Sequence, residues 1–161
     1  MKDKKILAAY FSCTGTTARV ANEVAKAAGA DLFEIKPAQP YTAADLDWTV
    51  KGSRSSREMA DEHFRPEIAD RVGNMAEYGV VFVGFPIWWY VAPRIIQTFL
   101  ESYDLSDKTV VPFFTSGGSG AGKTDAILHK CCPAAHFLPS IHLSVNVTAE
   151  GLKKQLSALK F

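Results

Sequence analysis

The 161-residue sequence has little of several features that mark specialised classes of protein. It has no excess of one charge, since 18 basic and 17 acidic side chains leave a net charge of +1, which argues against a nucleic-acid partner. It has three cysteines, two of them adjacent, which do not make a disulfide framework and indicate a reducing cytoplasm. Its N-terminal apolar run is too short for a membrane span and lacks a signal-peptide cleavage site, so we expect no membrane association.

No internal repeat, low-complexity tract or Gly-, Ser- or Pro-rich linker divides the chain. Apolar residues make up 47% of the sequence and charged residues 22%, which is ordinary for a folded globular protein and argues against disorder. A chain of this length can bury a substantial hydrophobic core. We therefore expect one domain over residues 1–161.

Strand-like and helix-like segments alternate along the chain. Residues 4–12, KKILAAYFS, form a continuous apolar run typical of a strand buried on both faces. A long irregular stretch at 38–66 interrupts the pattern, and loops of that length are usually functional. The alternation predicts a doubly wound α/β/α fold, in which helices cover both faces of a five-stranded parallel sheet. The other expected strands are 31–37, 79–87, 108–116 and 135–143, and the expected helices are 17–29, 67–76, 93–103, 120–132 and 148–159.

Three loops of this predicted fold follow strands and therefore lie at one edge of the sheet. In doubly wound sheets, ligands bind beyond the carboxyl ends of the strands, close to the point where the strand order reverses. That rule selects residues 12–17, 85–90 and 115–120 as the candidate binding segments.

The first of these segments, SCTGTT at 12–17, has the chemistry of a phosphate-binding loop. Its hydroxyls and backbone N–H groups stand at the positive end of a predicted helix, where they can hold a phosphate without Lys or Arg. Gly15 lets the backbone approach a ligand closely. A simple helix cap is the alternative, but four hydroxyl residues exceed what a cap needs. The candidate phosphate-binding residues are Ser12, Cys13, Thr14, Gly15, Thr16 and Thr17.

The other two segments predict a site for a flat ring. FPIWWYVAP at 85–93 places three aromatic residues directly after a buried strand, and consecutive side chains cannot all face one core. We expect one tryptophan to pack in the core and the other to stack on a conjugated ligand. The glycines of TSGGSG at 115–120 allow a backbone to pass close to the ligand edge, although a tight strand-to-helix turn is the alternative. The candidate ring-binding residues are Pro86, Ile87, Trp88, Trp89, Ser116, Gly117, Gly118 and Gly120.

The sequence also contains a formally complete Walker A pattern, Gly117-x-x-x-x-Gly122-Lys123-Thr124. In a Walker A loop the Thr binds Mg²⁺, usually with help from an Asp at the end of another strand, and no later strand here ends in Asp. A better phosphate loop already follows the first strand. We therefore reject a nucleotide triphosphatase and expect Lys123 and Thr124 to face solvent in the first turns of a helix.

A second suggestive pattern is the group of His129, Cys131, Cys132 and His136. Adjacent thiols do not easily bind one tetrahedral zinc ion, so ordinary packing is the favoured interpretation and we expect no metal site. Cys13 lies near backbone N–H dipoles, which can lower the pKa of its thiol. We expect the backbone of Cys13, rather than its sulfur, to matter for binding.

With these residues in view, the chain resembles the flavodoxin family. The phosphate loop of that family reads Ser/Thr-x-Thr-Gly-x-Thr, which SCTGTT at 12–17 fits. The PIWW and SGG segments resemble the two family loops that flank the isoalloxazine ring, and the pattern of strands and helices spans about residues 4–159. The resemblance implies strand order 2-1-3-4-5 and non-covalent binding of FMN. The phosphate would lie in the first loop, and the ring between a tryptophan and the Gly-rich turn.

The same resemblance implies a low-potential electron carrier that passes electrons between a reductase and an acceptor protein. An apolar aromatic wall disfavours the anionic reduced flavin and so lowers its potential, and no catalytic acid or base is needed. Two alternatives stay open: an NAD(P)H-dependent FMN quinone reductase of the flavodoxin-like fold, and a binding domain for another phosphorylated ligand. Whether the protein is an enzyme depends on which alternative holds, and we expect a monomer or a weak dimer.

Overall fold

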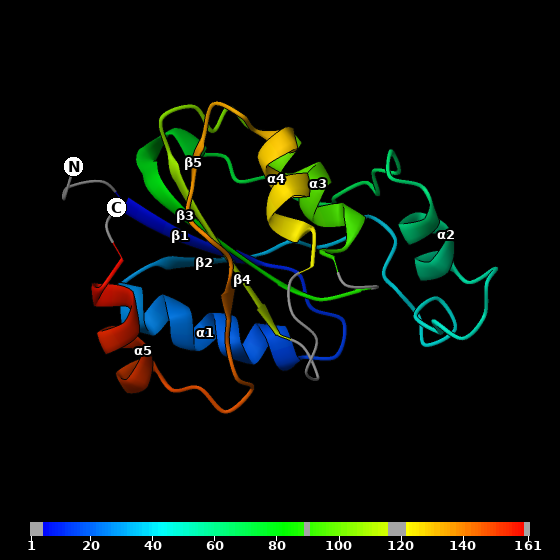
Figure 1. Cartoon of the computed structure of the whole chain (residues 1–161), viewed down its shortest axis with the longest axis horizontal. Coiled ribbons are helices and arrows are strands. Elements are labelled where there is room, and N and C mark those ends of the chain that lie inside the picture. Colours follow the sequence, from blue (N-terminus) through cyan, green and yellow to red (C-terminus); the bar gives the residue numbers. More distant parts are fainter. Residues whose placement is uncertain (1–4, 89–90, 116–121, 160–161) are drawn as a thin grey trace.

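A parallel β-sheet divides the molecule into three layers in the computed structural model, which describes residues 5–88, 91–115 and 122–159 (Figure 1). The strands lie in the order β2-β1-β3-β4-β5, and β6 also pairs with β4. Helices α1 and α5 cover one face of the sheet, and α3 and α4 cover the other (Figure 1). The predicted α/β fold and its strand order are therefore confirmed.

The strands are β1 (Lys5–Tyr10), β2 (Asp31–Glu34), β3 (Tyr78–Pro86), β4 (Thr109–Thr115), β5 (His136–Phe137) and β6 (Ile141–His142). The helices are α1 (Thr16–Ala28), α2 (Arg54–Ala60), α3 (Arg94–Glu101), α4 (Thr124–Cys131) and α5 (Ala149–Ser157), with a 3₁₀ turn η1 (Met75–Glu77).

The central strands bury alternate residues in two cores, one on each face of the sheet. Along β1, Leu7 and Ala9 belong to the core shared with α3 and α4, whereas Ala8 and Tyr10 belong to the core shared with α1 and α5. Successive side chains of a strand point to opposite faces, so a strand covered on both faces must be apolar throughout. This is why the first strand reads as a continuous apolar run.

The last predicted strand, 135–143, is divided into the two short strands β5 and β6. They pair with β4 on either side of Pro112. The carbonyls of Val110 and Phe114 face this edge of β4, because both accept backbone hydrogen bonds from the edge chain. Pro112 lies midway between them and faces the same side, but it has no N–H to donate. The edge strand is therefore interrupted where the ladder lacks a donor.

Residues 67–76 form no α-helix in the structure, so that prediction is wrong. Ile68, Val72 and Met75 follow helical spacing, but the start of the segment lies antiparallel to residues 36–38 and exchanges two backbone hydrogen bonds with them. Only the short turn η1 at its end is helical. Tertiary pairing thus overrides the local helical pattern.

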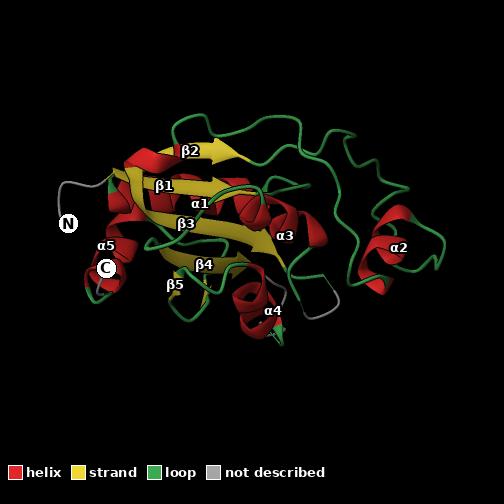
Figure 2. Cartoon of the chain, turned by 90° about the horizontal axis from the view of Figure 1, so that it is seen from above, coloured by secondary structure: helices red, strands yellow, loops and turns green. Residues whose placement is uncertain are grey.

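Helix α2 lies inside the stretch 38–66, which the sequence analysis describes as irregular. Ser53 caps the helix by accepting a hydrogen bond from the N–H of Ser56, and Arg54 pairs with Glu58 one turn later. Figure 1 and Figure 2 both show α2 beyond the carboxyl ends of the strands, away from the rest of the helices. The long stretch therefore extends the molecule at the edge where the binding loops are predicted.

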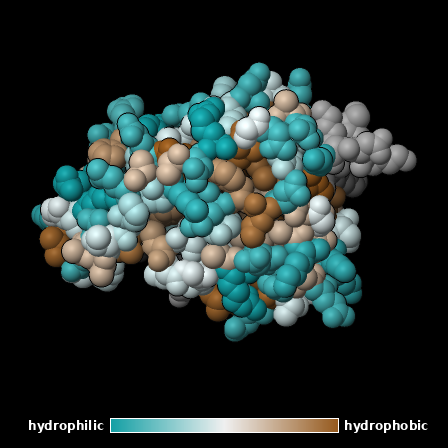
Figure 3. All heavy atoms as spheres, turned by 180° about the vertical axis from the view of Figure 1, so that it is seen from behind, coloured by the Kyte–Doolittle hydropathy of each residue, from teal (hydrophilic) through white to brown (hydrophobic). Residues whose placement is uncertain are grey.

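Polar and apolar side chains are interspersed on the face of the molecule shown in Figure 3. The large hydrophobic side chains that are exposed come from separate parts of the described chain: Leu32, Trp48, Val50, Phe64 and Val145. None of the helices within the described ranges has the length and apolar character needed to cross a lipid bilayer.

Gly84 of β3 leaves room for the buried ring of Phe113 on the neighbouring strand β4. The two residues pair in register, and a Cβ placed on Gly84 would lie 2.2 Å from the Cζ atom of that ring. Phe113 is only 1% exposed, so its ring has no free space into which it can move.

Replacement of this glycine, Gly84→Ala, is expected to lower the free energy of unfolding by about 1–3 kcal/mol, the usual cost of overpacking a core. Urea denaturation measures the loss. Gly73→Ala serves as the control, because a Cβ at Gly73 meets nothing within 4 Å. Adding Phe113→Leu to Gly84→Ala should recover part of the stability, and a Gly84→Ala protein as stable as the wild type would contradict the argument.

Candidate functional site

The carboxyl ends of β1, β3 and β4 lie side by side, because these strands are adjacent and parallel. The loops that leave them therefore start at one edge of the sheet (Figure 2). The loop after β1 and the first part of the turn after β3 are described in full. Five of the predicted site residues lie outside the described residues and stay predictions: Trp89, Ser116, Gly117, Gly118 and Gly120.

Loop 12–17 turns the chain from β1 into α1. The N–H of Gly15 donates to the Oγ of Ser12 at 3.1 Å, which closes the turn. Gly15 has φ 91°, a left-handed conformation, and its carbonyl accepts the first helical hydrogen bond, from the N–H of Arg19. A Cβ at Gly15 would meet nothing within 4 Å. The turn thus requires glycine for its backbone conformation, and the space beside it is open.

This open loop has the donors that a phosphate group needs. The first-turn N–H groups of α1 have no partner inside the helix, and they carry the positive end of the helix dipole. Thr14 and Gly15 are exposed, and Ser12 and Thr16 are partly exposed. No acidic residue occurs between Phe11 and Glu23 to oppose an anion. The loop can therefore hold a phosphate through N–H and hydroxyl groups alone.

Thr17 is turned away from the open side of the loop. Its hydroxyl is hydrogen-bonded to that of Thr115, the last residue of β4, at 2.8 Å, and both residues are buried. The bond ties the start of α1 to the end of β4, and each hydroxyl satisfies the other. The Thr17 side chain is thus engaged in the structure, and only its backbone N–H remains for a phosphate.

The single variants Thr17→Val and Thr115→Val are each expected to lower the free energy of unfolding by about 1–3 kcal/mol, because each leaves the other hydroxyl buried without its partner. The double variant should lose less than the sum of the two, since it removes both polar groups together. Urea denaturation of the four proteins gives the coupling energy. Strictly additive losses would show that the two hydroxyls do not depend on each other.

Trp88 is held by packing at the edge of the core. Its N–H and C=O pair with those of Val91 at 2.8 and 3.1 Å, which closes a tight turn after β3. Pro86 pairs with Thr115, and the N–H of Ile87 donates to the carbonyl of Thr115 at 3.2 Å, so this turn is also fixed to β4. The Trp88 side chain is partly buried and packs against the core. Trp88 therefore packs against the core while remaining partly exposed at this edge of the sheet, and which tryptophan stacks on a ligand stays a prediction.

Tyr41 also lies at this edge of the sheet, and the sequence does not single it out. Its ring packs edge-on against Phe11 and Trp88, with both pairs of ring centroids 5.6 Å apart. Phe11 and Trp88 are themselves 5.7 Å apart, so the three rings form a closed aromatic cluster. The cluster joins the end of β1, the turn after β3 and the start of the stretch 38–66. The only signal in the sequence is an aromatic residue that directly follows Pro40 in a polar stretch.

A buried ion pair supports Tyr41 from its other side. The Arg54 guanidinium lies 3.8 Å from the centre of the Tyr41 ring, and its Nε donates to Glu58 Oε2 at 2.9 Å. The Tyr41 hydroxyl donates to the other oxygen of the same carboxylate, which is 1% exposed. Burial and this hydrogen bond raise the pKa of the Tyr41 phenol. Both carboxylate oxygens thus have donors, as a buried carboxylate requires.

Arg94 attaches α2 to α3. Its guanidinium donates to the carbonyls of Glu58 and Met59 at 3.4 and 3.0 Å and to the side chain of Gln97 at 3.2 Å. The two carbonyls stand near the C-terminal end of α2, where the helix dipole favours a cation. Burial lowers the pKa of Arg94 from the usual arginine value. The stretch 38–66 is therefore anchored through Tyr41 and through α2.

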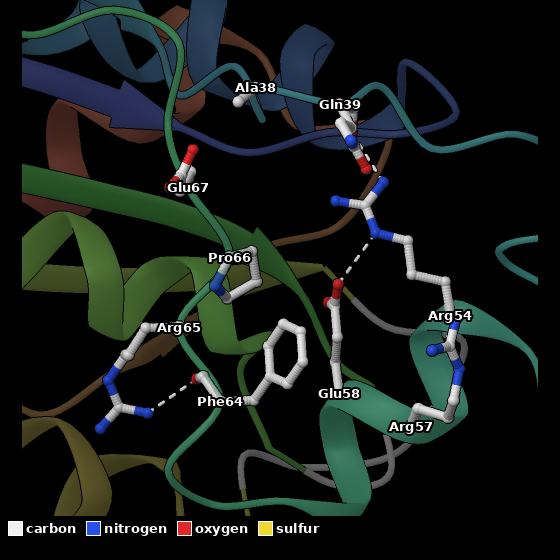
Figure 4. Close-up of a pocket in the computed structure, with 9 residues that line it drawn as sticks. All are labelled: Ala38, Gln39, Arg54, Arg57, Glu58, Phe64, Arg65, Pro66 and Glu67. Atoms are coloured by element: carbon white, nitrogen blue, oxygen red, sulfur yellow. Dashed lines mark hydrogen bonds and ion pairs between the residues drawn. The ribbon is translucent and has the colours of Figure 1, made fainter.

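A pocket of about 390 Å³ opens beside the ion pair. Figure 4 shows Pro66 and the Phe64 ring across this pocket from Arg54 and Glu58. Arg65 also lines the pocket, but its guanidinium is paired with Glu101 of α3 at 2.9 Å. The Arg54–Glu58 pair thus contacts Tyr41 of the aromatic cluster and also lines an open pocket.

The Cys13 thiol does not have the lowered pKa expected from nearby N–H dipoles. Burial against the core raises its pKa to about 11, and the charge of Glu58 adds to this, while Arg54 opposes it. Burial is therefore the dominant influence on this thiol, and it favours the protonated form. That only the backbone of Cys13 matters for binding stays a prediction.

Thr124 does not face solvent, so that expectation is wrong. It is fully buried at the start of α4, and its hydroxyl accepts a hydrogen bond from the N–H of Ala92 at 3.1 Å. Lys123 is exposed, as expected. A Thr hydroxyl engaged in this way is not available to bind Mg²⁺, which supports rejecting the Walker A interpretation.

The histidines and cysteines near the end of α4 make separate contacts. The His129 ring packs against Phe137 with centroids 4.8 Å apart, and the Cys131 and Cys132 thiols donate to backbone carbonyls of α4 and α3, respectively. In the described parts of the chain, no three His, Cys, Asp or Glu side chains come together as metal ligands would.

Comparison with known proteins identifies the family. The model of the flavodoxin family matches residues 5–159 of the chain. A crystal structure described as a flavoprotein of Bacteroides eggerthii DSM 20697 is 50% identical over 98% of this chain and 99% of its own, with a TM-score of 0.91. Another, from Bacteroides uniformis ATCC 8492, is 47% identical over 96% of this chain and 98% of its own, with a TM-score of 0.90. The chain therefore belongs to the flavodoxin family.

More distant structures share the fold. A flavoprotein of Lactobacillus acidophilus NCFM in complex with FMN is 22% identical over 86% of this chain and 93% of its own, with a TM-score of 0.66. No protein with a curated description matches the chain.

Proposed function

We propose that this protein binds FMN at the carboxyl edge of the sheet and carries electrons between redox partner proteins. One observation supports the proposal: an open, hydroxyl-rich helix N-terminus and a fixed aromatic cluster meet at this edge. The first suits a phosphate and the second a flat ring, and FMN joins both in one molecule. The crystallised complex of the Lactobacillus acidophilus flavoprotein with FMN supports the same cofactor here.

The described residues fit this cofactor. When bound, FMN supplies the reversible uptake of electrons that the chain itself lacks. Loop 12–17 balances the phosphate charge with N–H and hydroxyl donors, so it needs no basic side chain. Tyr41 and Trp88, which are partly exposed and pack on the buried Phe11, would form an apolar wall beside that loop and limit the access of water to one side of the ring. Neither role requires an acid or a base.

Purified protein is expected to be yellow and to bind FMN roughly 10²- to 10⁴-fold more tightly than riboflavin, because two charge-assisted hydrogen bonds to a phosphate contribute about 1.5–3 kcal/mol each. Quenching of flavin fluorescence measures both dissociation constants. Gly15→Ala should weaken FMN binding more than riboflavin binding, because the left-handed φ of 91° strains any other residue in the loop. Equal affinity for the two flavins, or binding of neither, would contradict a phosphate site at 12–17.

A second candidate function is an NAD(P)H-dependent FMN quinone reductase, and the pocket beside the Arg54–Glu58 pair supports it. A carrier that meets only other proteins needs no small-molecule pocket at this edge, whereas a reductase must admit a nicotinamide and an acceptor. Two sequence features point the same way. The chain lacks the strong negative charge typical of flavodoxin carriers, and residues 87–90, Ile-Trp-Trp-Tyr, lack the glycine that many of them have after the third strand.

Turnover separates the two candidates. As a carrier, the FMN-loaded protein should oxidise neither NADH nor NADPH at a steady rate, with or without an added quinone, because it depends on a partner reductase. Absorbance of the nicotinamide, followed over time under anaerobic conditions, measures this rate. A rate of about 1 s⁻¹ or more, in the usual range of enzymes, would establish the reductase instead.

A further inference from the structure

A buried carboxylate and a largely shielded guanidinium lie next to the wall of the proposed ring site. The side chains of Arg54 and Glu58 are 16% and 1% exposed, and they form an ion pair at 2.9 Å. Arg54 covers the Tyr41 ring, and Tyr41 contacts Trp88. A charge that is shielded from water acts over a longer distance than a solvated charge. Each member of the pair can therefore influence a group bound at this wall.

We infer that Arg54 and Glu58 act with opposite signs on the electrostatic potential at the bound flavin ring, so that the balance between them controls the reduction potential of the cofactor. The inference rests on the proposed binding of FMN. The guanidinium and the carboxylate balance each other, so the ring of the wild-type protein experiences neither charge alone. A reduced flavin is anionic, so an unbalanced cation nearby favours it and an unbalanced anion disfavours it.

The loop that would hold the phosphate already responds to both charges. Arg54 lowers and Glu58 raises the pKa of the Cys13 thiol, which lies between Ser12 and Thr14. The two charges thus act with opposite signs on a group inside the candidate site. Asp45 lies 3.9 Å from Arg54, but its side chain is 30% exposed, so water screens it more than it screens Glu58.

Two nearly isosteric substitutions leave one charge at a time. Glu58→Gln keeps an acceptor for the Tyr41 hydroxyl and leaves Arg54 unbalanced, so binding of reduced FMN should strengthen relative to oxidised FMN. Arg54→Gln leaves Glu58 unbalanced, so binding of reduced FMN should weaken relative to oxidised FMN. A unit charge about 10 Å from the ring, at an effective dielectric constant of about 20, changes the ratio of the dissociation constants of oxidised and reduced FMN roughly tenfold. Tenfold corresponds to about 59 mV for a one-electron couple.

The experiment measures the dissociation constants of oxidised and reduced FMN and the midpoint potential under anaerobic conditions. The wild type, both single variants and the double variant Arg54→Gln/Glu58→Gln are compared. We expect the midpoint potential to shift with opposite signs in the two single variants. In the double variant, the ratio of the dissociation constants of oxidised and reduced FMN should stay within about threefold of the wild-type ratio. A purely structural role of the pair would move both single variants in the same direction, which would overturn the inference.

A matched control comes from a similar contact elsewhere in the chain. Arg71 lies over the Tyr103 ring at 4.9 Å, beyond the end of α3, and is exposed, so Arg71→Gln removes a cation that stacks on another tyrosine without disturbing the Arg54–Glu58 pair. It should leave the potential unchanged, and a shift equal to that of Arg54→Gln would overturn the inference.

If Arg54→Gln unfolds α2, as judged by hydrogen exchange over 53–60, Glu58→Gln decides alone: a raised potential supports the inference and a lowered or unchanged one overturns it. A wild-type protein that binds neither form of FMN would instead overturn the proposed function, and this inference with it.

Discussion

In the middle of the sheet, Tyr10 of β1 pairs with Gly84 of β3, and Gly84 pairs in turn with Phe113 of β4. This register brings three strands to the same edge and requires them to end within a few residues of one another. Loop 12–17 and the turn at Trp88 are neighbours only because of it. The hydrogen bond between the hydroxyls of Thr17 and Thr115 then fixes loop 12–17 to the end of β4. A slip of β4 by one residue would turn its side chains to the opposite faces of the sheet and break that contact.

The stretch 38–66 depends on the same edge but is held by different forces. It has a single short helix and few buried apolar side chains, so hydrophobic burial alone does not fix its position. Charged and aromatic contacts replace it: Arg94 binds the end of α2, and Arg54 and Glu58 enclose Tyr41. Such contacts are directional, so they fix geometry more sharply than apolar packing does. They also place charges near the proposed flavin site, which apolar anchors would not.

Much of the fold follows from the sequence because local patterns and burial agree there. Continuous apolar runs predict the central strands, and Gly29 ends α1 in a left-handed conformation as its position suggests. The errors arise where long-range contacts decide. Ile68, Val72 and Met75 have helical spacing, but pairing with residues 36–38 keeps the first of them extended. The role of Tyr41 depends on Phe11 and Trp88, which are distant in sequence, and no local signal reveals that the three rings meet.

Long-range contacts also explain why only one of the two phosphate-loop patterns in the sequence remains a candidate phosphate site. Both SCTGTT and the Walker A pattern combine glycine with hydroxyl residues, and composition alone does not separate them. The difference lies in what each hydroxyl contacts. Thr14 stays exposed beside the open space at Gly15, whereas Thr124 is buried and accepts the N–H of Ala92. A ligand needs donors that the fold has not already used, and of these two threonines only Thr14 leaves its hydroxyl exposed at the sheet edge. The aromatic cluster of Phe11, Tyr41 and Trp88 adjoins the loop that contains Thr14, because Phe11 directly precedes Ser12. The open donors and the aromatic rings therefore lie at the same edge of the sheet, whereas the hydroxyl of Thr124 is already used inside the fold.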